Sequence, residues 1–300
     1  MTPRLLARLR ADLVHVHDLT APPLPGTHLS EPAATFPVPS GDHPEGCAAS
    51  PDLTRAVYST ADAVVCLASD GRTVWRHPVE PTPDNSYSIR TSCAFTADGT
   101  VVWVCRPHPA EDVWLALDAA SGTPRGRFVL GTAGHGGEHH AHPGGTDMLL
   151  DVGEGQDGTV IFRGRLTGSA VELLPYPWAD RVLIDLAPDG RSFLTVDHAQ
   201  EDVALHSYPD GEVQWRCDAA AFGPDLEDAY VEWNGGYLDT DTVVVTISHA
   251  DGYRHHRVAA GTGLVLGPLE TPSLDEYDLR PLGDGSWLTT DGGGHLWRHS

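Results

Sequence analysis

Residues 183–217, with the sequence LIDLAPDGRSFLTVDHAQEDVALHSYPDGEVQWRC, decide the fold of this chain. Four short runs follow one another in this stretch, at residues 183–187, 192–196, 203–208 and 212–216. The turns after the first and third runs contain Asp-Gly, and an Asp-Gly pair between two alternating runs is a strong signal for a β-hairpin. The stretch therefore predicts a meander of four antiparallel strands.

The same unit recurs along the chain at a nearly constant spacing. The turn after the first strand is centred on residues 52, 98, 144, 189, 240 and 284, with gaps of 46, 46, 45, 51 and 44. An aspartate before the third strand recurs at a similar spacing, at Asp62, Asp112, Asp157, Asp202, Asp251 and Asp291. Recurrence of one four-stranded unit is typical of a β-propeller, in which each repeat forms one blade. We therefore predict an all-β protein, a single β-propeller of four-stranded blades, with six blades favoured and seven as the alternative.

Two of the repeats resemble the WD-repeat β-propeller family in their turns. Residues 95–99 (FTADG) and 186–190 (LAPDG) resemble the first turn of that family's repeat, and residues 112–115 (DVWL) and 202–205 (DVAL) resemble the entry to its third strand. The resemblance covers residues 48–299 and is to a degenerate bacterial member, because the Gly-His pair of the family is missing from every repeat. It implies the fold and no chemistry, since propellers host unrelated functions.

We expect one domain over residues 1–300, with the repeats occupying residues 47–300. Residues 1–12 are expected to be a flexible N-terminus, and residues 18–46, rich in Pro and Gly, a crossing loop. The last repeat has room for only three strands, whereas residues 13–17 (LVHVH) alternate as a strand does. We therefore expect residues 13–17 to pair with residues 295–299 and close the ring, which removes exposed edges. The alternative is a seventh blade hidden in the N-terminal segment.

The charge of the chain limits its partners. The formal net charge is −23, from 19 basic and 42 acidic residues. Such a surface repels phosphate, so neither nucleic acid nor an anionic membrane is expected as a partner. No apolar run suits a signal peptide or a spanning helix, and the five cysteines form no CxxC pair. We therefore expect a cytoplasmic location.

Three histidines fall in the predicted loops between second and third strands, at His108, His198 and His249. These loops and those that join the blades emerge on one face, where binding residues tend to lie. Together with Glu201 the three histidines have the residue types of a metal site. The favoured alternative is that they descend from one ancestral repeat and lie on a solvated rim.

A histidine-rich run, GHGGEHHAHP, occupies residues 134–143. His135, His140 and His142 are candidate ligands for zinc or another divalent metal, because His140 and His142 are two apart on a predicted strand. This spacing is no recognised zinc motif. We therefore favour loop and strand histidines that bind carbonyls or water, with no cofactor.

A third group of candidate residues emerges when the first strands of the repeats are aligned with one another. This alignment places Ala48, Ala94, His140, Asp185, Gly236 and Arg280 at one equivalent position. In the favoured interpretation, His140, Asp185 and Arg280 form a structural network between blades, with Arg280 as the partner of Asp185. The alternative is an acid–base site at the channel mouth, completed by His198 and Glu201.

Residues 151–158 (DVGEGQDG) carry the last candidate ligands, Glu154, Gln156 and Asp157. Glycines around them allow close approach of a ligand to the backbone. Asp157 also matches the aspartate that precedes every third strand, which favours an architectural role for it, whereas Glu154 and Gln156 have no counterpart in the other repeats.

The leading functional hypothesis is a non-enzymatic, monomeric binding or scaffold protein. It would present an acidic, His-rich loop face to a protein partner or a small polar ligand. The alternative is an enzyme with a site at the channel mouth that uses His, Asp and Glu for acid–base chemistry, with or without a metal.

Overall fold

A computed structural model describes residues 4–21, 27–29, 31–81, 91–108, 110–132, 136–145, 147–168, 170–178, 180–223 and 229–300. The chain divides into two compact units, which are described separately. Unit 1 comprises Met1–Ala21 and Glu31–Pro177, and unit 2 comprises Pro22–Ser30 and Trp178–Ser300.

Unit 1 contains four antiparallel sheets among its described residues. The strands of the first two sheets are β1 (Leu5–Arg10), β2 (Leu13–Asp18), β4 (Ala34–Pro37), β5 (Gly46–Ala49), β6 (Arg55–Ser59), β7 (Ala63–Ala68) and β8 (Thr73–Pro78). Those of the other two are β9 (Ser92–Phe95), β10 (Val101–Arg106), β11 (Val113–Asp118), β12 (Pro124–Val129), β13 (Gly137–Ala141), β14 (Asp147–Gly153), β15 (Thr159–Thr167) and β16 (Ala170–Pro175). The first sheet has the order β1-β2-β4, and each later sheet takes four consecutive strands.

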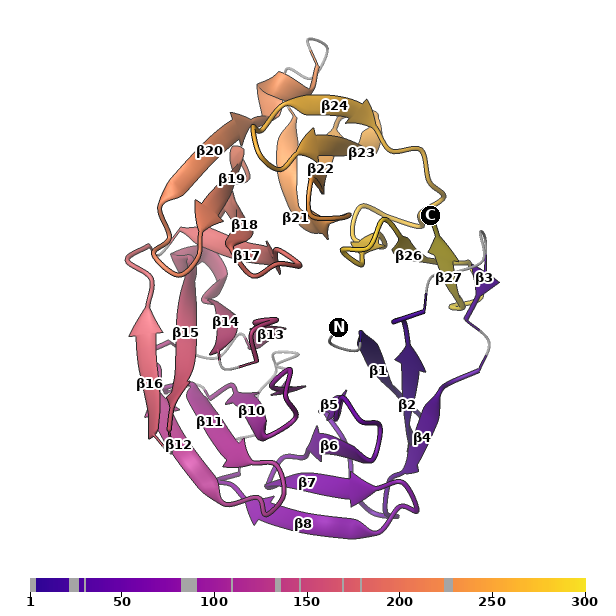
Figure 1. Cartoon of the computed structure of the whole chain (residues 1–300), viewed down its shortest axis with the longest axis vertical. Helices are drawn as coiled ribbons and strands as arrows, with labels where there is room; N and C mark the ends of the chain where they lie inside the picture. The colour runs from indigo at the N-terminus through magenta and orange to yellow at the C-terminus, as the bar shows by residue number, and fades with distance from the viewer. Residues whose placement is uncertain are drawn as a thin grey trace. The chain divides into compact units, whose positions relative to one another are not determined.

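Unit 2 contains three four-stranded antiparallel sheets among its described residues (Figure 1). Their strands are β17 (Arg181–Leu186), β18 (Ser192–Asp197), β19 (Asp202–Ser207), β20 (Val213–Asp218), β21 (Tyr230–Tyr237), β22 (Thr242–His249), β23 (Gly252–Ala259), β24 (Val265–Pro268), β25 (Arg280–Pro281), β26 (Trp287–Thr290), β27 (Leu296–His299) and β3 (Thr27–His28). The only helices among the described residues are two short 3₁₀ turns, η1 (Gly155–Asp157) and η2 (Ala219–Phe222). None of the helices described is long and apolar enough to cross a membrane.

The predicted β-propeller of four-stranded blades is confirmed, and the described residues form seven blades, the alternative number. The meander of residues 183–217 is confirmed as β17 to β20. The recurring turns have a shared physical cause, because the aspartate after the first strand accepts a bond from the backbone N–H two residues later. This bond joins Asp98 Oδ1 to Thr100 N at 3.0 Å and Asp189 Oδ1 to Arg191 N at 2.9 Å.

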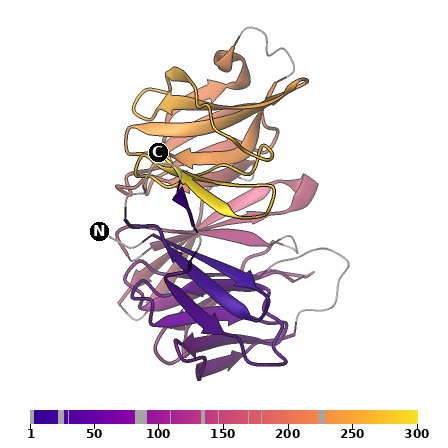
Figure 2. The same ribbon diagram turned by 90° about the vertical axis from the view of Figure 1, so that its right-hand side faces the viewer.

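The expected roles of the N-terminal residues are wrong in detail. Residues 13–17 lie in β2, which pairs with β1 and β4 rather than with the C-terminal strand. The fourth strand of the last blade is instead β3, which lies beside the yellow C-terminal strand β27 (Figure 2). In this pairing Trp297 lies opposite His28. An N-terminal strand therefore does complete the last blade, but it comes from residues 27–28.

The flexible N-terminus and the crossing loop are corrected as well. Residues 5–10 form β1, whose Leu5, Ala7 and Leu9 pack on the core of the first blade. The expected loop at residues 18–46 contains β3 and β4 and the first residue of β5. Apolar side chains that alternate toward a core explain why both segments are strands.

One apolar cluster of unit 1 contains a pair of packed aromatic side chains. Trp103 and Trp114 are fully buried, with ring centroids 4.3 Å apart. Gly164 leaves room for them, because a Cβ there would lie 2.4 Å from the ring of Trp103. This close packing of aromatic rings stabilises that cluster, which lies beside the two other apolar clusters described in unit 1.

Buried polar side chains are distributed through the core of unit 2. Arg181 forms an ion pair with Asp202 at 2.7 Å, and Arg298 forms one with Asp284 at 2.7 Å. The carboxylate of Asp202 also receives Arg216 at 3.3 Å. Pairing of this kind is what allows charged groups to lie inside a protein.

Candidate functional site

Strand β21 carries a large bulge in unit 2. Val231 pairs with Ile247 and the next pair is Gly235 with Val245, so residues 232–234 stand opposite a single residue of β22. Gly235 permits this path, since its φ is 145° and a Cβ would lie 2.3 Å from the carbonyl oxygen of Val244. Bulges re-aim side chains and are frequent beside functional sites.

The first residue of the bulge, Glu232, is a buried carboxylate. Only 2% of its surface is exposed. Its Oε2 accepts hydrogen bonds from Gln200 Nε2 at 3.2 Å and from the Tyr277 hydroxyl at 2.7 Å. Burial, together with the bond to Glu232, raises the pKa of Tyr277, so this hydroxyl remains a donor.

The second residue of the bulge, Trp233, begins an exposed aromatic surface. Its ring lies 5.4 Å from that of His198 in a stacked arrangement, and its Nε1 donates to the carbonyl of Asp197 at 3.2 Å. Trp233 is 37% exposed, Tyr230 43% and Tyr277 51%. We call Tyr230, Trp233 and Tyr277 the aromatic patch.

The connection between β24 and β25, residues 269–279, carries Tyr277 and is bonded to the bulge of β21. Asn234, the third bulge residue, donates from Nδ2 to the carbonyl of Glu276 at 2.6 Å. The negative charges of Glu232 and Glu276 both raise the pKa of Tyr277. The patch therefore combines apolar rings with nearby carboxylates.

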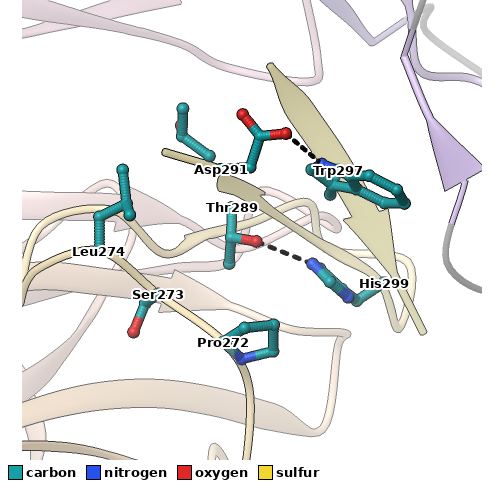
Figure 3. Close-up of a pocket in the computed structure, with 8 residues that line it drawn as sticks. Pro272, Ser273, Leu274, Thr289, Asp291, Trp297 and His299 are labelled. Atoms are coloured by element: carbon teal, nitrogen blue, oxygen red, sulfur yellow. Dashed lines mark hydrogen bonds between the residues drawn. The ribbon is translucent and has the colours of Figure 1, made fainter. Parts of the chain in front are cut away.

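A pocket of about 330 Å³ lies beside the same connection (Figure 3). It is lined by Pro272, Ser273, Leu274, Thr289, Thr290, Asp291, Trp297 and His299. Thr289 Oγ1 is bonded to His299 Nε2 at 2.8 Å, and Trp297 Nε1 donates to Asp291 Oδ2 at 3.1 Å. Because these polar groups already bind one another, the pocket suits a small apolar group.

Asp291 is held ionised at the edge of this pocket. The backbone N–H groups of His295 and Gly293 and the indole of Trp297 donate to its carboxylate, which holds its pKa well below the usual range. Its bonds fix the turn between β26 and β27. We therefore assign Asp291 a structural role.

Asp185 lies in a first strand, as the alignment of the repeats predicts. Its Oδ2 accepts the backbone N–H of Tyr237 on β21 at 2.8 Å, and its Oδ1 accepts the N–H of Leu186 at 2.8 Å. A Cβ at Gly236 would lie 2.7 Å from Oδ2, so this glycine allows the contact. Asp185 thus links two neighbouring blades.

The predicted pair of Asp185 with Arg280 is wrong. Arg280 is exposed, and no ion pair or hydrogen bond joins these two described residues. The backbone N–H groups of Tyr237 and Leu186 bind the carboxylate in place of Arg280. Asp185, His198, Glu201 and Arg280, which the acid–base hypothesis places around one pocket, do not line the pocket beside β26.

The rim histidines occupy separate settings. The Nδ1 atoms of His108 and His249 accept the backbone N–H of the second residue after each, at 3.1 Å and 3.3 Å. His198 stacks on Trp233, and Glu201 is exposed beside that loop. Across the described ranges, no group of three or more His, Cys, Asp or Glu side chains is arranged to hold a metal ion.

The histidine-rich run contributes to unit 1 mainly through a residue that the metal hypothesis left out. His139 Nε2 accepts the indole N–H of Trp114 at 2.9 Å, while its Nδ1 meets Ser92 Oγ at 3.0 Å. Burial lowers the pKa of His139 to about 3. Since Trp114 occupies Nε2, Nδ1 carries the proton and cannot accept one from Ser92. This arrangement is therefore a structural link.

The structure describes two of the three proposed zinc ligands, His140 and His142, and their ring nitrogens have different surroundings. His140 lies in β13, and its buried Nε2 has no hydrogen-bond partner among the described residues. His142 follows the end of that strand and accepts the backbone N–H of Gly144 at 3.0 Å. His135 lies outside the described residues.

Glu154, Gln156 and Asp157 surround the short helix η1 in unit 1. Gln156 and Asp157 are exposed, and Glu154 is half-buried. The carboxylate of Asp157 makes no bond within the described part of the chain, unlike the buried Asp112, which accepts Thr132 Oγ1 at 2.9 Å. Asp157 therefore matches the other repeats in sequence without sharing their contacts.

Neither Glu232 nor any residue of the aromatic patch is among the site residues predicted from the sequence. The signal that was available is the run YVEWNGGY in β21, where Asn-Gly-Gly interrupts a strand that otherwise holds large side chains. Glycine inside a strand pattern often marks a bulge.

Comparisons with known proteins support the fold alone. No family model and no curated protein matches the sequence. Among solved structures, dihydro-heme d1 dehydrogenase NirN in complex with DHE is 16% identical, with a TM-score of 0.60 over 96% of this chain. The chain spans 58% of the length of that protein.

Two further solved structures are described as propellers. The β-propeller domain of Cps50 (Swd1) from Myceliophteria thermophila is 11% identical, with a TM-score of 0.62 over 98% of this chain and 92% of that one. The Dos1 propeller is also 11% identical, with a TM-score of 0.57 over 96% and 73%. Likeness at such low identity carries no ligand or activity to this chain.

Proposed function

We propose that the protein is a non-enzymatic binding protein and that the aromatic patch of unit 2 is its docking surface. The observation that supports this proposal is the exposure of Tyr230, Trp233 and Tyr277 on one bulged strand and the connection beside it. Tyrosine and tryptophan are the side chains most enriched among residues that dominate binding energy. Exposed aromatic side chains that gather on one surface mark interaction sites.

The surroundings of the patch favour a polar or cationic partner. The formal net charge of −23 gives the protein a field that attracts cations. Glu201 is exposed in the connection between β18 and β19, whose His198 stacks on Trp233. Asp275 is exposed and Glu276 half-buried in the connection between β24 and β25. We therefore propose a protein segment or a small polar ligand as the partner, bound by a monomer in the cytoplasm.

A peptide array tests this proposal. Labelled wild-type protein is compared with the double variant Trp233→Ala/Tyr277→Ala on extended peptides of basic, neutral and acidic composition. The matched control is Val213→Ala/Leu264→Ala, since these side chains are 50% and 63% exposed in the same unit.

The patch variant should lose the peptides that the wild type retains, while the control should keep them. Thermal unfolding checks that both variants remain folded. An unchanged peptide pattern in the patch variant would contradict the proposed docking surface.

A further inference from the structure

We infer that the docking surface recognises a guanidinium group, carried by an arginine in an extended segment of the partner. This inference rests on the proposed function and names its ligand. It follows from the properties of Glu232 and Trp233, which are consecutive residues of the bulge and both contact the loop at residues 197–200.

Glu232 differs from Asp202, the other buried carboxylate that the structure describes in unit 2. Asp202 is 6% exposed and is paired with Arg181, whereas Glu232 is 2% exposed and meets only the neutral groups of Gln200 and Tyr277. No cationic side chain pairs with Glu232 among the described residues. A buried carboxylate without a cation is costly, so an incoming positive charge would be favoured.

The unused oxygen of Glu232 adds to this argument. Both hydrogen bonds reach Oε2, and Oε1 receives none from the described residues. A carboxylate has about four acceptor sites. A donor from outside the chain would therefore find free acceptor capacity beside the exposed rings.

Trp233 supplies a flat face for the same ligand. His198 covers one side of the indole at 5.4 Å, and 37% of Trp233 remains exposed. A guanidinium is planar, stacks on aromatic rings and donates several hydrogen bonds in one plane. An ammonium lacks this planar stacking, so arginine is expected to bind more tightly than lysine.

One series of three peptides that differ at a single position isolates the contribution of the guanidinium. Fluorescence anisotropy measures binding of a labelled Gly-Ala-Arg-Ala-Gly peptide and of versions with citrulline or lysine in place of arginine. Citrulline keeps the shape and removes the charge. Salt near the physiological level, about 0.15 M, screens attraction to the distant surface charges.

The wild type should bind the arginine peptide at least about tenfold more tightly than the citrulline peptide, because charge-assisted bonds are the stronger ones. Glu232→Gln should abolish this preference and leave thermal stability intact. Glu212→Gln removes one exposed carboxylate elsewhere in unit 2 and should leave the preference unchanged. Equal binding of arginine and citrulline peptides by the wild type would overturn the inference, as would a preference that survives Glu232→Gln.

The variant Trp233→Ala separates this inference from the proposed function. If Trp233→Ala weakens the binding of the arginine and citrulline peptides equally, and Glu232→Gln weakens the binding of neither, the guanidinium inference fails and the docking surface stands. If Trp233→Ala leaves every peptide unaffected, the docking surface fails too. Absence of binding to all three peptides would overturn the guanidinium inference, and the peptide array then decides the proposed function.

Discussion

The two units stabilise their blades by different chemistry. In unit 1 the rings of the fully buried Trp103 and Trp114 pack against each other in a tilted arrangement. In unit 2 each blade instead joins its second and third strands by a threonine–histidine bond, at Thr195–His206, Thr246–His255 and Thr289–His299. Apolar packing barely depends on pH, whereas a buried neutral histidine resists protonation.

The difference indicates where polar groups are tolerated. Burial lowers the pKa of His206 and of His255 to about 4, so both stay neutral in the folded state. Unit 2, which buries these histidines, also contains Glu232, a buried carboxylate that no cationic side chain pairs with among the described residues. Unit 2 therefore gains polar specificity in its interior from three threonine–histidine bonds. Unit 1 also buries a neutral histidine, His139, but its described partners are Trp114 and Ser92 rather than a threonine.

Replacement of Trp103 should reduce the free energy of unfolding more than any of the following substitutions in unit 2. Trp103→Ala leaves a cavity in unit 1 and should reduce the free energy of unfolding by about 3 to 5 kcal/mol. Trp103→Phe is the control, because the indole N–H has no partner among the described residues and its loss should cost about 1 kcal/mol or less. Urea unfolding measures both. Similar losses for the two variants would show that packing of the rings does not stabilise unit 1.

Breaking the buried ion pair of unit 2 should have the next largest effect. Asp202→Asn leaves Arg181, 4% exposed, without its charge partner and should cost about 3 kcal/mol. The double variant Arg181→Met/Asp202→Leu should recover part of the loss, since no unpaired charge then remains buried. A single variant as stable as the wild type in guanidinium unfolding would count against a polar core in unit 2.

Acid should lower the stability of the wild type more than that of His206→Gln. The folded-state pKa of His206, about 4, lies below the unfolded value of 6.5, so its stabilisation is present above pH 6.5 and is lost as the pH falls toward 4. At pH 5 the wild type should have lost about 2 kcal/mol through this residue relative to pH 7. The variant should lose less over the same range. Parallel unfolding curves against pH would rule out this coupling.

The smallest effect on stability is expected in the aromatic patch. Trp233 is exposed, and Trp233→Ala should change the free energy of unfolding by only about 0.5 kcal/mol. Thermal unfolding measures this change. A loss as large as that of Trp103→Ala would mean that the patch serves folding rather than binding.

The repeats made most of the fold predictable. The aspartate turns recur because each carboxylate satisfies a backbone N–H of its own turn, as Asp98 and Asp189 show. The aligned first-strand positions are confirmed, since residues 48, 94, 140, 185, 236 and 280 all lie in first strands.

The first blade escaped prediction because its hairpin lacks the usual turn residues. Ala11 adopts φ 49° between β1 and β2, where glycine or asparagine is the common signal. The number of blades was therefore undecided from sequence. The proposed docking surface was missed for a related reason. The sequence of β21 does not show how many extra residues its bulge inserts, so the side chains that it turns outward were not identified.

Photo-crosslinking tests the central claim most directly, because it locates the partner on the molecule. The arginine peptide is made with benzoyl-phenylalanine beside the arginine, bound to the wild-type protein and irradiated, and the adducts are mapped by mass spectrometry. We predict that the adducts concentrate in β21 and in residues 273–277, and that citrulline in place of arginine suppresses them. Adducts that concentrate in unit 1 or on the outer strands β20 and β24 would contradict the assignment of the docking surface.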